Sequence, residues 1–184
     1  MIPVLDKGHV ALLGKTMDGL AVQSLIFNFN AGVFDSKFLD IPVMALNVKC
    51  PLFVQLWLME NGIKVIPQRN SSAIVEAYIP SVPDLKIADL SVAEEVQQSI
   101  AHTTEALLLN PKGYQMDGCE RFISQIISPI SVYNTLVAYG SLNAWLEITE
   151  RKGLLGPIDE YRKAIKDVVH SEWAVIKPWL RRKM

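Results

Sequence analysis

Three residues near the N-terminus, Gly14-Lys15-Thr16, match the end of the phosphate-binding loop found in many nucleotide-hydrolysing proteins. That loop also needs a glycine five positions before Gly14, because its backbone must wrap closely around the phosphates. His9 occupies that position. We therefore do not assign a phosphate-binding loop to this segment.

The other chemically capable residues form no recognised catalytic or metal-binding pattern. His9, His102 and His170 are widely separated, and a metal site needs several donors that converge on one ion. Glu94 and Glu95 are adjacent on a predicted helix, where they face different directions and are typical of a first helical turn. No serine or cysteine stands in a Gly-x-Ser-x-Gly turn. Generic motifs alone therefore predict neither a metal site nor an enzyme.

The length and composition of the chain limit the number of domains and the kinds of partner that we expect. The chain has 184 residues, a formal net charge of -1 and 50% hydrophobic residues. This length predicts a single domain over residues 1–184. The small net charge gives no general attraction to nucleic acid or anionic lipid, so we expect neither as a partner. The hydrophobic fraction is high for a monomer of this size and favours a buried subunit interface.

The N-terminus and the cysteines indicate the compartment. Asp6, Lys7 and His9 interrupt the apolar N-terminal run, which is therefore not typical of a signal peptide. No stretch approaches the ~18 apolar residues that a membrane-spanning helix needs. Cys50 and Cys119 are too few for a disulfide framework. We expect a cytoplasmic protein with both cysteines reduced and no contact with a membrane.

The elements that must position any site alternate between strand and helix in the first half of the chain. Apolar and β-prone runs predict strands over residues 10–13, 43–48 and 63–66. Asp18 is expected to cap a first helix, and Pro51 to open a second helix that Asn61-Gly62 ends. These patterns predict an α/β (α+β) fold with a mixed sheet and covering helices.

The second half of the chain reads as mostly helical after an internal loop over residues 80–89. Ser91 and Glu94 match a capping box. Further helices are predicted over residues 120–128, from Ser131 onward, and from Pro157 onward. In three of these helices, the apolar residues expected to face the core share helical spacing. They are Val92, Val96 and Ile100 in the helix that Ser91 caps; Val132, Leu136, Tyr139, Leu142 and Leu146 in the helix from Ser131; and Ile158, Tyr161, Ile165 and Val168 in the helix from Pro157.

Several segments, in matching order and over nearly the whole chain, resemble the flavin-dependent thymidylate synthases. They are residues 4–12, 47–54, 76–80, 140–145 and 159–162. The fourth reads Gly-Ser-Leu-Asn-Ala-Trp where the family has Gly-Asn-Leu-Arg-Ser-Trp. The resemblance implies an α/β domain assembled as a homotetramer, with sites at the subunit contacts. It also implies methylation of deoxyuridine monophosphate (dUMP), with methylenetetrahydrofolate as carbon donor and reduced FAD as hydride source.

The residues that this family uses for binding are largely replaced. The family's signature, an Arg-His-Arg run followed by Ser, Asn-Glu and Ser-x-Arg, has no Arg-His-Arg counterpart between Val54 and Arg69, and Glu60 brings a negative charge to that region. Other positions at which the resemblance implies site residues of the family also differ: Ile26, Asn28, Gln125, Ser141 and Asn143. The resemblance leaves Arg69, Gln68, Asn143 and Lys152 as candidates for nucleotide binding, and it assigns no catalytic residue.

Because each charge-assisted contact contributes roughly 1.5–3 kcal/mol, the loss of about five arginines should abolish most affinity for flavin and nucleotide. We therefore expect a non-catalytic homologue that keeps the fold and the oligomer and binds another ligand or a protein. FAD is expected only if the family function is retained. Two alternatives stay open: an active enzyme with a rebuilt site for dUMP or a related nucleotide, and a structural or assembly protein, for example of a virus.

Overall fold

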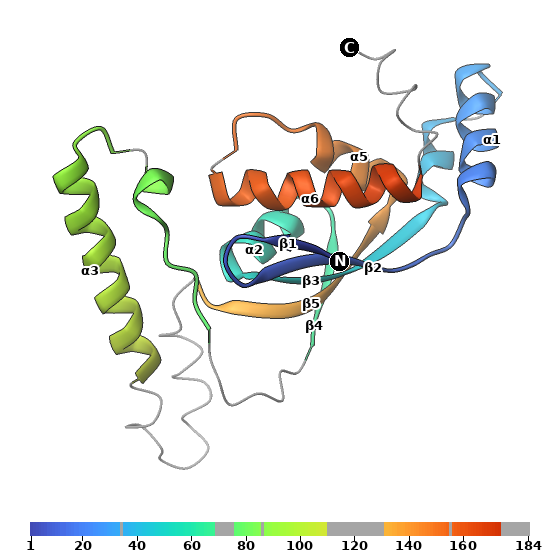
Figure 1. Ribbon diagram of the computed structural model, residues 1–184. Coiled ribbons are helices and arrows are strands. Elements are labelled where there is room, and N and C mark those ends of the chain that lie inside the picture. Colours follow the sequence, from blue (N-terminus) through green and yellow to red (C-terminus); the bar gives the residue numbers. More distant parts are fainter. Residues whose placement is uncertain (34, 69–75, 86, 110–130, 155, 174–184) are drawn as a thin grey trace.

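The computed structural model describes residues 1–33, 35–68, 76–85, 87–109, 131–154 and 156–173 (Figure 1). Their centre is a five-stranded sheet in the order β1-β2-β3-β5-β4, and every described strand pairing is antiparallel. The strands are β1 (Ile2–Val4), β2 (Gly8–Lys15), β3 (Val43–Pro51), β4 (Lys64–Pro67) and β5 (Tyr133–Ser141). The predicted α+β class is confirmed, and the sheet expected to be mixed is antiparallel.

Helices cover one face of this sheet. The covering helices are α2 (Leu52–Glu60), α5 (Leu142–Glu150) and α6 (Gly156–Glu172). Two further helices, α1 (Gly19–Asn30) and α3 (Leu90–Leu109), stand at opposite ends of the molecule (Figure 1). Two short 3-10 turns, η1 (Ser36–Asp40) and η2 (Val82–Leu85), precede β3 and α3. In the part of the chain that the structure describes, no helix is long and apolar enough to cross a lipid bilayer.

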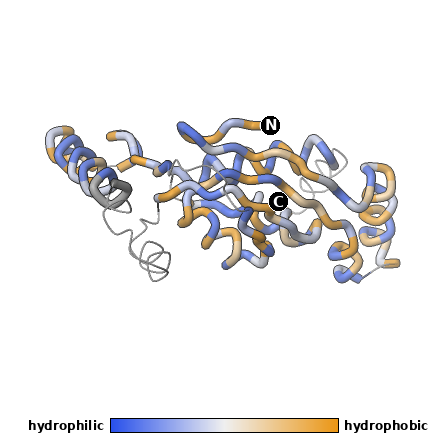
Figure 2. The backbone as a smooth tube through the Cα atoms, turned by 90° about the horizontal axis from the view of Figure 1, so that it is seen from below, coloured by the Kyte–Doolittle hydropathy of each residue, from blue (hydrophilic) through white to orange (hydrophobic). Residues whose placement is uncertain are grey.

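The core lies between the sheet and the covering helices, because strand side chains alternate between the two faces. On β3, Leu46 and Val48 are fully buried beneath the helices, whereas Asn47 and Lys49 are half-buried on the opposite face. Figure 2 shows hydrophobic and hydrophilic stretches interspersed along the strands and helices. Trp145 on α5 is the largest of the fully buried side chains.

The helix predicted from Ser131 onward is a strand over its first part. The segment after Ser131 forms β5, which pairs with β3 from Pro51↔Tyr133 to Val43↔Ser141. The helix begins only at Leu142, where the Ser141 hydroxyl accepts a hydrogen bond from the Ala144 amide at 3.3 Å. The apolar spacing that suggested one helix runs across a strand–helix junction, and the β-branched and aromatic residues before the junction favour the strand.

The start of α3 also differs from the prediction. Asp89 rather than Ser91 caps the helix, since its Oδ1 accepts hydrogen bonds from the Ser91 amide at 2.9 Å and the Ser91 hydroxyl at 3.1 Å. Val92, expected to be buried, is 44% exposed, while Ala93 and Thr104 are buried. The inward row of α3 is therefore turned by one residue from the predicted row.

Several predicted boundaries are confirmed. The Asp18 carboxylate accepts a hydrogen bond from the Ala21 amide at 2.8 Å and caps α1. Gly62, with φ of +79°, ends α2 in the left-handed conformation that favours glycine. The final helix opens at Gly156-Pro157, and its inward row is buried at Tyr161, Ile165 and Val168. Residues 120–128, predicted to be helical, lie outside the described residues.

Candidate functional site

A pocket of about 290 Å³ opens where β5 passes into α5. Its walls come from the beginning of β3, the turn after α2, the beginning of β4, the end of β5 and the first turn of α5. The lining residues are Val43, Gly62, Lys64, Tyr139, Gly140, Ser141 and Ala144. Three of these residues, Gly140, Ser141 and Ala144, belong to residues 140–145, one of the segments that resemble the thymidylate synthases.

Strand pairing fixes the polar wall of the pocket. Lys64 pairs directly with Tyr139 across β4 and β5, which brings the Lys64 ammonium to 5.9 Å from the centre of the Tyr139 ring. An ammonium at this distance is attracted by the face of an aromatic ring. The contact holds a cationic side chain beside the pocket.

Close packing fixes the end of β5 beside the pocket. A methyl group on Gly140 would lie 2.6 Å from Ile63 Cδ1, so no larger residue fits without a shift of that side chain. The Trp145 indole is fully buried and donates a hydrogen bond to the Met44 carbonyl at 3.1 Å. This bond ties the first turn of α5 to β3 and makes that part of the site rigid.

The charge balance of the pocket is modest. Lys64 is the single cationic side chain among the described lining residues. The Ser141 hydroxyl donates a hydrogen bond to Asp40 Oδ1 at 2.8 Å. A carboxylate thus stands directly behind a lining hydroxyl and opposes the binding of a second anionic group nearby. The described lining residues offer one ammonium, of Lys64, and two hydroxyls, of Ser141 and Tyr139, and no guanidinium.

The structure does not bring the predicted nucleotide-binding residues together. Asn143 is half-buried on α5 next to the lining residue Ala144, and its amide lies 3.5 Å from Glu147 Oε1. Gln68 is exposed beyond the far end of β4, where its backbone N–H donates to the Thr135 carbonyl at 2.8 Å. Among the candidates that the structure describes, only Asn143 is adjacent to the pocket.

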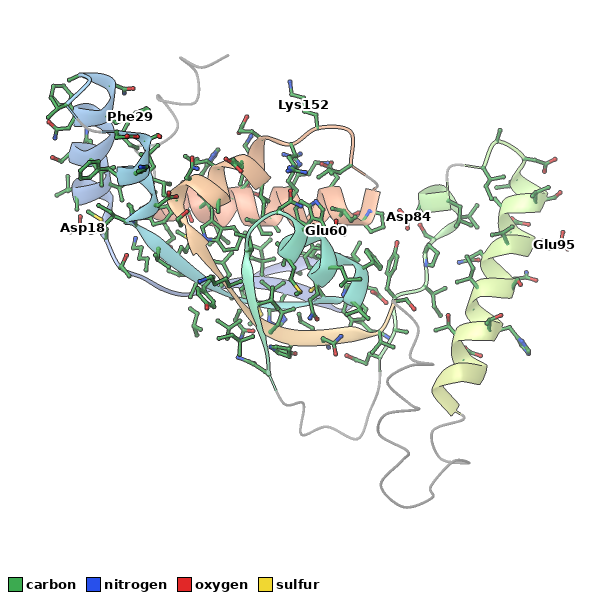
Figure 3. All side chains as sticks on the ribbon, turned by 180° about the vertical axis from the view of Figure 1, so that it is seen from behind. Asp18, Phe29, Glu60, Asp84, Glu95 and Lys152 are labelled. Atoms are coloured by element: carbon green, nitrogen blue, oxygen red, sulfur yellow. The ribbon has the colours of Figure 1, made fainter. Side chains whose placement is uncertain are left out.

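Of the two remaining candidates, the structure describes only Lys152, which is also outside the pocket lining. Lys152 is exposed in the connection between α5 and α6, and its side chain extends away from the sheet (Figure 3). Arg69 lies outside the described residues. Arg162 does not replace a missing arginine, since it pairs with Asp159 at 2.7 Å and donates to the Thr149 carbonyl at 2.8 Å.

Sequence reasoning missed Lys64 and Tyr139 as pocket residues. Both residues could have been found from the sequence. Lys64 lies in the interval that replaces the Arg-His-Arg signature, and Tyr139 directly precedes Gly140, the first residue of the segment that resembles the family. The segment around Tyr139 was predicted to be helical, and only its strand pairing with β4 places the two side chains together.

A second polar cluster lies at the opposite end of β3 and β5. The Tyr133 hydroxyl donates to Asp6 Oδ1 at 2.6 Å, and the Tyr161 hydroxyl donates to the Lys49 carbonyl at 2.7 Å. The Lys49 ammonium also forms an ion pair with Glu76. These contacts hold the N-terminal turn, β3 and α6 together.

Burial raises the pKa values of both phenols of this cluster and of the Cys50 thiol on β3. Burial raises the pKa of the Cys50 thiol to about 12. Burial, together with the Asp6 carboxylate, raises the pKa of Tyr133, and burial raises that of Tyr161. The thiol and both phenols therefore stay protonated, which suits a structural role rather than nucleophilic or acid–base chemistry.

Comparison with known proteins identifies a protein of similar fold. No family model matches the sequence, and no curated protein matches it. The chain is similar in structure to the UMP/dUMP methylase PolB from Streptomyces cacaoi, solved with bound 5-Br dUMP, with a TM-score of 0.70 and 16% sequence identity. The match covers 95% of this chain and 94% of PolB. At this identity the likeness shows the fold alone, and it confirms that the chain has a thymidylate synthase-like fold.

Proposed function

We propose that this chain is a non-catalytic relative of the thymidylate synthase-like methylases, which keeps their fold and a pocket for one small ligand. The observation that carries the proposal is the pocket at the junction of β5 and α5. Its described lining holds one cation, Lys64, and one of its two hydroxyls, that of Ser141, is hydrogen-bonded to the Asp40 carboxylate.

The size and charge of this pocket do not fit FAD together with a nucleotide. Its volume of about 290 Å³ is at the lower end of the range for small-molecule sites, roughly 300–1,000 Å³. Tight phosphate binding usually employs guanidinium forks or several convergent cations. A single ammonium beside a carboxylate supports one small ligand with at most one negative charge.

The absorbance spectrum of the purified protein tests this proposal directly. We expect no flavin band after expression with excess riboflavin, and no flavin retained after incubation with FAD and gel filtration. A bound flavin whose visible absorbance is bleached by NADPH would contradict the non-catalytic proposal.

One observation favours a second candidate, an enzyme that acts on dUMP or a related pyrimidine nucleotide through a rebuilt site. The Lys64 ammonium is held beside the pocket by the Tyr139 ring, and the structurally similar PolB was solved with 5-Br dUMP. In this case Lys64 would contact the phosphate, and Arg69 and Asn143 would complete the site.

Calorimetric titration with dUMP separates the two candidates. If the enzyme candidate holds, Lys64→Ala weakens dUMP binding about tenfold or more, as expected for loss of a charge-assisted contact. Lys163→Ala is the matched control, because Lys163 is an exposed lysine on α6. Absence of heat at millimolar dUMP excludes the enzyme candidate and agrees with the first proposal.

A further inference from the structure

Helix α1, which stands apart from the helices that cover the sheet (Figure 1), exposes an apolar and uncharged face. Leu20 is 76% exposed and Phe27 is 71% exposed, although both are large hydrophobic residues. Residues seven apart lie on the same face of a helix, so Leu20 and Phe27 form one exposed row. Residues 19–34 contain no Asp, Glu, Lys, Arg or His, and an exposed helix without any charge is unusual. This row therefore presents apolar surface that a binding partner would bury.

The end of helix α6 lies at the base of α1. The Glu172 carbonyl is 3.9 Å from the position that a Cβ on Gly19, the first residue of α1, would occupy. The Trp173 indole donates a hydrogen bond to the Met17 carbonyl at 3.1 Å. The Lys15 ammonium also pairs with the Glu172 carboxylate at 2.9 Å. The chain that follows Trp173 therefore starts from the N-terminal end of α1.

The sequence after Trp173 is suited to an apolar surface. Residues 174–184, which lie outside the described residues, read Ala-Val-Ile-Lys-Pro-Trp-Leu-Arg-Arg-Lys-Met. The large apolar residues in the first part of this segment are Val175, Ile176, Trp179 and Leu180. The basic residues Arg181, Arg182 and Lys183 follow directly. The segment thus combines an apolar first part with a cationic end.

We propose that residues 174–184 dock along the exposed row of α1 in the same chain. The segment begins where the row begins, and both are apolar, so docking removes two apolar surfaces from water. The covalent connection also favours this partner, because a segment joined to its site by a short linker acts at a roughly millimolar effective concentration. Any separate molecule has to compete with a segment that is always present.

The lengths of the segment and the row are compatible. Phe27 lies about 12 Å along the helix axis from the first residue of α1. An extended chain advances about 3.3 Å per residue, so residues 174–179 can span up to about 20 Å. Trp179 can therefore reach Phe27, and Ile176 can cover Leu20 on the way.

The charges favour one direction of docking, from the N-terminal to the C-terminal end of α1. The C-terminal end of a helix carries a partial negative charge, and the last turn of α1 contains no basic residue. Residues 35–40, which follow α1, add two aspartates and one lysine. With Trp179 over Phe27, the basic residues 181–183 come next to this negative region, where opposite charges attract.

Acrylamide quenching of tryptophan fluorescence tests the proposal, with Trp179 as the reporter. Trp57, Trp145 and Trp173 are buried, so they respond weakly to the quencher. The difference between the wild type and Trp179→Phe gives the accessibility of Trp179, which we expect to be low. Phe27→Glu should weaken docking about tenfold or more, because it removes an apolar contact and places a charge in the contact. Quenching should therefore increase, and adding Trp179→Phe should remove the increase.

Two controls make the result specific to this contact. Leu90→Glu is the matched variant, since Leu90 is 65% exposed on the distant α3, and circular dichroism verifies that each variant keeps the fold. Shielding within one chain does not depend on protein concentration, so the quenching is repeated over a dilution series. A fully accessible Trp179 in the wild type, or equal quenching of Phe27→Glu and Leu90→Glu, would overturn the proposal. Shielding that is lost on dilution would also overturn it and would assign the face to a contact between two chains.

Discussion

Replacement of Gly8 by alanine should destabilise the fold strongly, because β2 passes directly beneath a buried phenol. A methyl group on Gly8 would lie 1.8 Å from the Tyr161 hydroxyl oxygen, 2.8 Å from the Val4 carbonyl and 2.9 Å from the Lys49 carbonyl. Tyr161 is fully buried and donates its hydrogen bond to that same Lys49 carbonyl at 2.7 Å. The phenol therefore cannot retreat without breaking this bond.

The expected loss follows from two contributions. Overpacking a close-packed core costs about 1–3 kcal/mol, and the disrupted Tyr161 hydrogen bond costs about 1 kcal/mol more. Gly8→Ala should thus lower the free energy of unfolding by about 3 kcal/mol, a large share of the roughly 5–15 kcal/mol typical of a domain. Urea denaturation followed by circular dichroism measures this free energy.

A double-mutant cycle identifies the cause. Tyr161→Phe alone should cost about 1 kcal/mol, and in that background Gly8→Ala should cost about 1–2 kcal/mol less than in the wild type, because the shortest contact is gone. Gly14→Ala in the same strand is the control, since nothing lies within 4 Å of a methyl group there. Additive effects within about 0.5 kcal/mol, or a Gly8→Ala protein as stable as Gly14→Ala, would refute this reasoning.

Two further predictions concern polar contacts at the ends of the molecule. Asp18→Ala removes the cap of α1 and should lower the free energy of unfolding by about 1 kcal/mol, whereas Asp18→Asn should largely preserve it; equal losses in urea denaturation would contradict the capping role. Hydrogen bonds from Ser81, with a smaller contribution from Tyr78, lower the pKa of Asp84 below its ordinary value of 3.8. The ionised carboxylate therefore stabilises the fold above about pH 4 and ceases to do so as the pH falls through the lower folded value. Asp84→Asn should show a smaller loss of unfolding free energy between pH 7 and acidic pH than the wild type, and an identical pH dependence would contradict the prediction.

Local signals predicted many elements of the fold, and the main error arose where two elements join. Caps and breakers such as Asp18 and Gly62 act within a few residues, so they can be read from sequence and are confirmed. The strand β5 is the fifth in sequence but the fourth in the spatial order of the sheet, between β3 and β4. Its pairing partner, β3, lies about eighty residues earlier, and no local pattern encodes that contact.

The same limitation applies to the pocket. The resemblance placed a site near residues 140–145, and the structure has a pocket there. Lys64 enters that pocket only because β4 pairs with β5, a contact between residues 64 and 139. Gln68 and Lys152 were candidates because of the resemblance, and the structure places both outside the described lining.

The segment over residues 140–145 explains why the fold could be recognised while the activity could not. Where it agrees with the family pattern, at Gly140, Leu142 and Trp145, the residues suit the packing: a methyl group on Gly140 would require the Ile63 side chain to shift, and the other two residues are fully buried. Where it departs, at Ser141, Asn143 and Ala144, the side chains are half-exposed at or beside the pocket. The resemblance is therefore carried by residues that hold α5 against β3, and the divergence is concentrated in residues that face a ligand. Such a division is expected when the fold stays under constraint and the ligand chemistry does not, and it supports a changed ligand more strongly than a chance similarity of sequence patterns.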